Sequence, residues 1–149
     1  MAYYAHTQQG NFMRLTAFIP LAVSFAFPHL QPDAPPAVRV LMAVVMALLA
    51  LAILAFSSLT IEVDAQEIRW RFGSRFWRKS LPLADIVSAT QVRNEWWYGL
   101  GIHYTPHGWL YNVGGLDAVE IELRGGRRLR LGTDEPEELA RALASLRRS

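Results

Sequence analysis

Residues 40–59 read VLMAVVMALLALAILAFSSL, a run that contains no charge, no proline and no glycine. An α-helix rises about 1.5 Å per residue, so a helix over this run would just cross a hydrocarbon core of roughly 30 Å. A helix packed into a soluble core would carry polar residues along one face, whereas only Ser57 and Ser58 are polar here, both at the end. The run therefore predicts a transmembrane helix.

A second apolar run, LTAFIPLAVSFAFPHL, precedes it at residues 15–30. A helix of that length reaches only roughly 24 Å, and Pro20 would leave one backbone carbonyl without its helical partner. A secretory signal peptide is disfavoured because residues 1–13 contain no lysine or arginine, whereas a re-entrant or interfacial segment stays open. We expect a hairpin of two transmembrane helices, 15–30 and 40–59, joined by a short loop at 31–39.

The placement of charge predicts how this hairpin is oriented. In the loop 31–39, Asp33 balances Arg39, whereas Arg14 and the many basic residues after residue 60 lie on the other side. The positive-inside rule then places both termini in the cytoplasm. We therefore expect a multi-pass protein of the inner (cytoplasmic) membrane, with residues 1–14 as an N-terminal cytoplasmic segment.

From residue 60 onward apolar and polar residues alternate, which predicts half-buried β-strands. Residues directly opposite each other on neighbouring strands point to the same face of the sheet. A hairpin register can therefore be tested by parity, that is, by asking whether it places apolar residues opposite apolar ones. A loop at 64–67 would pair Val63 with Ile68 and place Glu62 opposite Arg69. A turn at 105–108 would match Leu100, Ile102 and Tyr104 with Val113, Tyr111 and Trp109.

A third hairpin surrounds the dipeptide Gly125-Gly126. A two-residue turn there would set apolar Ile121 against Arg130, which would have to face opposite ways. A three-residue loop, 124–126, instead pairs Ile121 with Leu129 on the inner face and Glu120 with Arg130 on the outer face. We expect the three-residue loop.

The chain ends in a helical pattern at about residues 135–147. Asp134 and Glu137 have the spacing of a capping box, and apolar residues such as Leu139 and Leu143 then recur on one face. Residues 60–149 thus predict a mainly-β domain in which seven to eight antiparallel strands curl into an open barrel. The C-terminal α-helix would cap this barrel, so the fold class is a membrane α-hairpin plus a capped β domain.

The segments LTIEVDAQEIRWRFG, RKSLPLADIVSATQV and GTDEPEELARAL give the chain a family resemblance. With the hairpin in front, residues 59–147 resemble the bacterial pleckstrin-homology-like (PH-like) domain membrane proteins. The resemblance implies a PH-like open barrel and a non-catalytic module at the cytoplasmic membrane face. The phosphoinositide binding of eukaryotic relatives does not carry over, because the loop 64–67 has two acids and no base.

The composition and motifs favour neither catalysis nor nucleic-acid binding. The chain has no cysteine, P-loop or nucleophile elbow, and His103 and His107, four apart, fall on a predicted strand and turn. Thirteen basic and twelve acidic residues after residue 60 leave a net charge of +1, far from a nucleic-acid surface. We expect no enzyme activity, no cofactor, no metal site and no nucleic-acid partner.

Two groups of residues remain as candidate binding sites. If Trp96 and Trp97 lie on one strand, only one can face inward, so the other lies at the surface, at the lipid boundary or against a protein partner. A basic group follows soon after the membrane exit and consists of Arg69, Arg71, Arg75, Arg78 and Lys79. These residues could bind anionic lipid headgroups. Alternatively, they could only set the orientation of the hairpin in the membrane and pair with residues on neighbouring strands.

These features predict a membrane-anchored interaction module that binds a protein partner or forms a homo-oligomer. The alternatives are recognition of anionic membrane lipid by the basic group, and a role as accessory subunit of a membrane transporter or enzyme.

Overall fold

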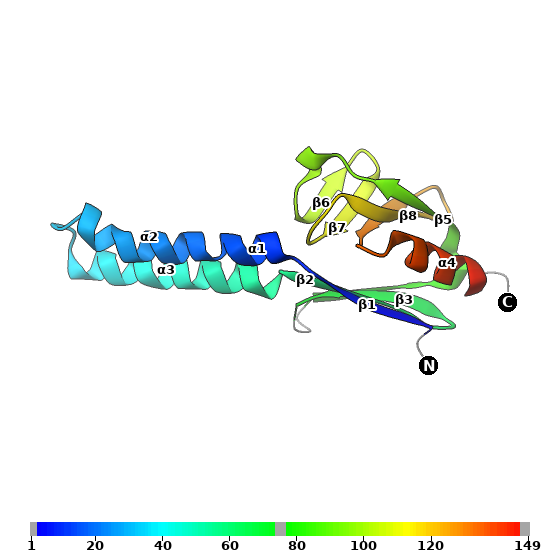
Figure 1. Cartoon of the computed structure of the whole chain (residues 1–149), viewed down its shortest axis with the longest axis horizontal. Coiled ribbons are helices and arrows are strands. Elements are labelled where there is room, and N and C mark those ends of the chain that lie inside the picture. The colour runs from blue at the N-terminus through cyan, green and yellow to red at the C-terminus, as the bar shows by residue number, and fades with distance from the viewer. Residues whose placement is uncertain (1–2, 74–76, 147–149) are drawn as a thin grey trace.

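A computed structural model describes residues 3–73 and 77–146 of the chain. It consists of a long helical hairpin that extends from one end of a β domain, as Figure 1 shows. Residues 4–9 and 136–146, near the start and the end of the described chain, both belong to the β domain, so the hairpin leaves it and returns to it.

The hairpin is built from helices α1 (Asn11–Thr16), α2 (Phe18–Leu30) and α3 (Pro36–Ala55). Two stretches of 20 residues, Asn11–Leu30 and Pro36–Ala55, are long and apolar enough to cross a membrane. The break between α1 and α2 has a local cause, because Pro20 has no N–H to donate to the carbonyl of Thr16.

Both helical stretches begin earlier than the sequence predicted, at residues 11 and 36 rather than 15 and 40. Pro36 occupies the first turn of α3, where a proline is favoured because its φ is preset and its missing N–H costs nothing. At the other end, Ser57 Oγ donates to Leu54 O at 2.8 Å, and the chain is already extended at Ser58. The expected helical end at residue 59 was therefore wrong.

Strand β1 (Tyr4–Gln9) comes before the hairpin and pairs antiparallel with β2 (Ser58–Val63), which follows it. Where the strands meet the helices, Gly10 N donates to Ser57 O at 2.7 Å. The helices are thus inserted between two neighbouring strands of one sheet. The sequence gives no alternating apolar signal over YAHTQQ, so the N-terminal segment was not expected to hold a strand.

The first sheet, sheet A, has the order β1-β2-β3-β4, with β3 at Glu67–Phe72 and β4 at Trp77–Pro82. Val63 is paired with Ile68 and Glu62 with Arg69, so the register predicted for the first hairpin is confirmed.

The second sheet, sheet B, follows a 3-10 turn, η1 (Leu83–Asp85), and has the order β5-β8-β9-β7-β6. Its strands are β5 (Ile86–Arg93), β6 (Gly101–Thr105), β7 (Gly108–Asn112), β8 (Asp117–Leu123) and β9 (Arg128–Gly132). The sheets are not closed into a barrel. The described residues form nine strands rather than seven to eight, and β7 and β9 run parallel, so the expectation of an all-antiparallel domain was wrong.

The predicted registers of sheet B hold where the strands form. Ile121 pairs with Leu129 and Glu120 with Arg130, so the three-residue loop is confirmed. Tyr104 pairs with Trp109 and Ile102 with Tyr111. The remaining expected pair, Leu100 with Val113, falls outside the strands.

The core lies between the two sheets and is closed at one end by α4 (Pro136–Leu146), whose Leu139 and Leu143 are fully buried. Arg130 lies on the outer face as predicted, yet it is only 7% exposed. Its Nε donates to Glu120 at 2.8 Å and its Nη1 donates to Asn94 Oδ1 at 3.1 Å. The buried guanidinium is therefore hydrogen-bonded to one carboxylate and one amide.

Substitution of Gly10 tests the connection between helices and sheet. A Cβ at Gly10 would lie 2.5 Å from Val113 O and 2.9 Å from Ser57 O, whereas one at Gly114 would meet nothing closer than 3.9 Å. We expect Gly10→Ala to destabilise the full chain in detergent by about 1 to 3 kcal/mol. Its thermal midpoint should fall by roughly 5 °C or more, and that of the control Gly114→Ala should not move. Equal midpoints for the two variants would contradict a tight junction.

Candidate functional site

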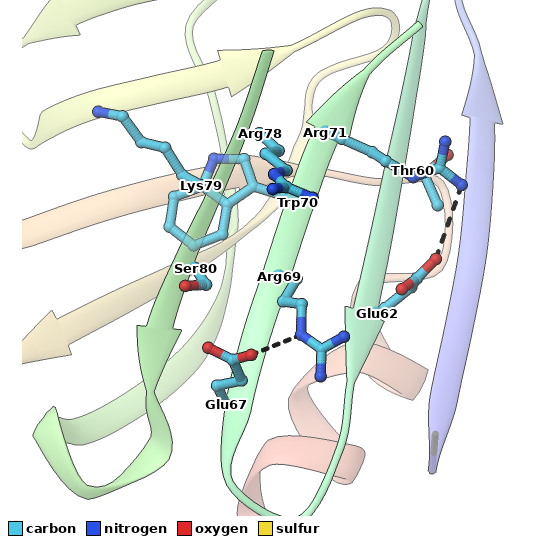
Figure 2. Close-up of a pocket in the computed structure, with 9 residues that line it drawn as sticks. All are labelled: Thr60, Glu62, Glu67, Arg69, Trp70, Arg71, Arg78, Lys79 and Ser80. Atoms are coloured by element: carbon cyan, nitrogen blue, oxygen red, sulfur yellow. Dashed lines mark hydrogen bonds and ion pairs between the residues drawn. The ribbon is translucent and has the colours of Figure 1, made fainter. Parts of the chain in front are cut away.

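A hollow of about 740 Å³ lies on the outer face of sheet A, which turns away from the core. We call it the charged groove. Figure 2 shows side chains from three adjacent strands lining it. The lining residues are Thr60 and Glu62 of β2, Glu67, Arg69, Trp70 and Arg71 of β3, and Arg78, Lys79 and Ser80 of β4.

At the end of the groove far from the helices, Arg69 is held by two acids, Asp64 of the β2–β3 turn and Glu67 at the start of β3. It forms ion pairs with Asp64 and, at 2.6 Å, with Glu67. Backbone N–H groups of Gln66 and Glu67 donate to Asp64, and with Arg69 nearby they lower the pKa of that carboxyl below its usual value. Arg69 therefore stabilises the β2–β3 turn through these two ion pairs.

Arg71 and Arg78 lie directly opposite each other on β3 and β4, near the helix end of the groove. Like charges at opposed positions repel. Arg71 turns toward Glu62, with 3.7 Å between Nη2 and Oε1, as the dashed line in Figure 2 marks. Within residues 3–73 and 77–146, no carboxylate forms an ion pair with Arg78. Arg78 is therefore the cation of the groove with the most unused binding capacity.

Lys79 belongs to a different environment, although the sequence placed it with the arginines. Its ammonium lies 5.5 to 5.9 Å from the ring centres of Trp77, Trp109 and Tyr111, on the inner side of β4. It also donates to Tyr111 Oη at 3.1 Å. Lys79 therefore bridges the open side between β4 and β7. The remaining member of the predicted basic group, Arg75, lies outside the described residues.

Trp96 and Trp97 occupy a short 3-10 helix, η2 (Trp96–Tyr98), and not the strand the sequence analysis considered. As a result both are exposed, at 76% and 61%, with their rings packed edge-on at 5.7 Å. Tyr104 is 74% and Trp109 46% exposed on the neighbouring β6–β7 hairpin. We call these four residues the aromatic edge.

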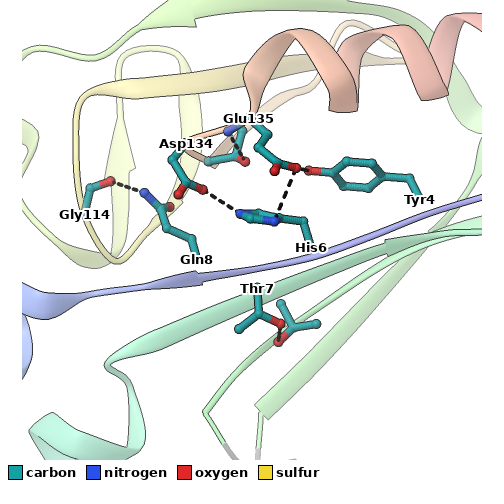
Figure 3. A network of polar contacts seen from close by, with 9 residues as sticks. Tyr4, His6, Thr7, Gln8, Gly114, Asp134 and Glu135 are labelled. Atoms are coloured by element: carbon teal, nitrogen blue, oxygen red, sulfur yellow. Dashed lines mark hydrogen bonds and ion pairs between the residues drawn. The ribbon is translucent and has the colours of Figure 1, made fainter.

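A polar cluster that the sequence analysis missed ties β1 to the start of α4 (Figure 3). His6 Nε2 lies 2.6 Å from Asp134 Oδ1, and His6 Nδ1 lies 3.3 Å from Glu135 Oε2. Tyr4 Oη donates to the same Glu135 oxygen at 3.4 Å. Burial, with Glu135 beside it, raises the pKa of Tyr4 to about 12, so the phenol remains a donor at neutral pH.

The two histidines considered as ligands are used locally. His103 Nε2 contacts Leu100 O, and His107 packs its ring against Tyr98 at 6.2 Å. Among the residues that the structure describes, no group of three or more histidine, aspartate or glutamate side chains is placed to hold a metal ion. The geometry thus offers two candidate binding surfaces, the charged groove and the aromatic edge.

No protein-family model matches this chain, and no curated protein sequence matches it.

Replacing Asp64 tests the electrostatics of the groove. Because folding lowers the pKa of Asp64, its stabilising effect is present above the unfolded value of 3.8 and is lost as the pH falls through the lower folded value. Asp64→Asn should therefore destabilise the chain at pH 6, and the difference from wild type should shrink as the pH is lowered from 6 to below 3.8. Thermal midpoints measured across this range provide the test. A difference that stays constant with pH would show that Asp64 acts only through neutral hydrogen bonds.

Proposed function

We propose that this chain is a membrane-anchored, non-catalytic interaction module whose charged groove binds a protein partner or a second copy. In this proposal α1–α2 and α3 cross the bilayer as a hairpin, which their length and apolar composition support. Since β1 pairs with β2, the two ends of the hairpin return to one side of the membrane. By the positive-inside rule, the position of the basic residues supports a cytoplasmic location for that side, at the inner membrane of a bacterium.

We also propose kinship with the bacterial PH-like domain proteins. The support is the order of elements, namely two stacked β-sheets followed by one C-terminal helix that closes an end of the core. The resemblance is one of architecture, and it agrees with a role in binding rather than in catalysis.

The observation that carries the proposal is the free edge of β4 beside the groove. In the described part of the chain β4 pairs with β3 alone, so its outer edge presents unpaired backbone donors and acceptors. Arg78 and Ser80 on this strand are exposed. An extended segment of another protein can add to such an edge through backbone hydrogen bonds while its side chains enter the neighbouring hollow.

The charges of the groove favour a protein segment over a purely anionic surface. Glu62 and Glu67 line the same hollow and already pair with Arg71 and Arg69. A partner with an acidic side chain opposite Arg78 would pair with its guanidinium without approaching these acids. Charge complementarity of this kind selects a partner and its register.

Site-specific photo-crosslinking in native membranes tests the proposal. A photoreactive residue at Ser80 should form a discrete crosslinked product, whereas one at Glu138 on α4 should not. Arg71→Glu with Arg78→Glu should weaken the Ser80 product roughly tenfold, and the charge-matched control Arg124→Glu with Arg127→Glu should leave it unchanged. A product at twice the chain mass of 16.8 kDa would identify a second copy as the partner. Equal products for the two double variants would contradict the groove as the binding surface.

Anionic lipid recognition is a second candidate function, favoured by the position of the opposed arginines. Arg71 and Arg78 lie one residue from the Phe72–Trp77 pair, and the Phe72 ring packs at 5.7 Å against Phe56 at the end of α3. The two guanidinium groups are thus close to the level at which α3 leaves the proposed bilayer, where phosphate groups lie.

Native mass spectrometry of the intact chain tests this alternative. If the arginines bind headgroups, phosphatidylglycerol should be retained more than phosphatidylcholine, and Arg71→Gln with Arg78→Gln should remove at least half of the difference. The intact chain is needed because β1 is part of sheet A. Equal retention of the two lipids would exclude headgroup recognition.

A further inference from the structure

The β domain is attached to the helices in one fixed direction. Only Phe56 and Ser57 separate α3 from β2, and only Gly10 separates β1 from α1. Figure 1 shows β1, β2 and β3 extending away from the hairpin roughly along its length. A bilayer that surrounds the helices therefore ends close to Ser57, where Arg14 Nε also donates to Ser57 Oγ at 3.4 Å.

Sheet B presents its β6 side toward the helices. The end of β7 rests on the junction, because Gln8 Nε2 donates to Gly114 O at 2.9 Å and Gly10 lies against Val113. β6 lies beyond β7 as the last strand of the sheet. In Figure 1, β6 and β7 lie on the side of the β domain that faces back along the hairpin, and the green turn at residues 96–98 lies on that side too.

We infer that the aromatic edge lies in the headgroup layer of the membrane that the hairpin crosses. The inference rests on the proposed function only in assuming that the hairpin is inserted. Trp96, Trp97 and Tyr104 are each more than 60% exposed in the chain alone. Tryptophan and tyrosine are enriched at the bilayer interface, where the ring contacts acyl chains and the N–H or O–H reaches water or phosphate.

The chemistry of the edge fits this layer better than a protein partner or the hydrocarbon core. Glu95 and Arg93 are exposed beside η2, and such charges are tolerated among headgroups but not deeper. The proposed bilayer begins at the junction on which the end of β7 rests, and the edge lies on the same side of the β domain, so lipid reaches the edge without any additional partner. The bilayer is therefore the occupant that the position of the edge selects.

This placement leaves the charged groove accessible. The groove is on the outer face of sheet A, whose strands point away from the membrane, so its opening faces sideways along the membrane. The aromatic edge and the groove consequently do not compete for one ligand. Docking of the edge would restrict tilting of the domain and hold the groove at a constant height above the bilayer.

Site-directed spin labelling tests the inference, and the chain has no native cysteine to remove. Nitroxide labels at Trp97→Cys and Tyr104→Cys, with Glu138→Cys on α4 as the aqueous control, would be compared in the full chain in phosphatidylcholine vesicles. We expect the two edge labels to be at least several-fold more accessible to oxygen, relative to a water-soluble nickel chelate, than the control label. Labels at the edge that match the control would overturn the inference.

Two further results separate this inference from the proposed function. Carbonate extraction of the same vesicles reports whether the hairpin is inserted, independently of the edge. A chain that resists extraction while its edge labels remain aqueous overturns the lipid contact and leaves the anchor intact. Edge labels shielded from both oxygen and nickel would indicate a protein contact at the edge, and would also overturn the inference.

Discussion

Backbone pairing between β1 and β2 is the constraint on which the rest of the molecule depends. The six residues of each strand are hydrogen-bonded neighbours, yet the whole helical hairpin lies between them in the sequence. Turning the β domain relative to the helices would require breaking these bonds or the Gly10–Ser57 hydrogen bond that ends the ladder. Buried backbone groups without partners are costly, so the junction behaves as a rigid joint rather than a linker.

The same joint explains why the N-terminal residues need a second attachment. An edge strand with few apolar residues gains little from burial, and β1 buries only one of its six residues. The contacts of Tyr4 and His6 with Glu135 and Asp134 hold its far end against α4, as Figure 3 shows. β1 and the start of α4 are thus joined through side chains, and the direction in which the helices leave is fixed at both ends of β1.

The parts of the fold that could be predicted from the sequence are those with strong local periodicity. The apolar runs predicted two helices, and parity alone gave the registers of Val63 with Ile68 and of Ile121 with Leu129. β1 was missed because its polar sequence carries no alternation. The parallel pairing of β7 with β9 was missed because it depends on tertiary packing. The burial of Arg130 escaped prediction for a similar reason, since the residue that covers it, Asn94, lies 36 positions away in a loop.

At the two candidate sites, the ligand suggested by residue type differs from the ligand suggested by position in the fold. From the sequence, exposed tryptophans suggested a protein partner and juxtamembrane arginines suggested lipid, because each type is enriched in such contacts. Position favours the reverse: η2 lies on the side of the β domain that faces back along the hairpin, and Arg69 and Arg71 are already paired with acids on the outer face of sheet A. The ligand of a surface depends on which molecules can approach it, and a rigid scaffold fixes this by fixing the direction in which the surface faces. Here the joint at Gly10 and Ser57 orients both surfaces, so a change in its geometry would alter the proposed lipid contact and the proposed partner binding together.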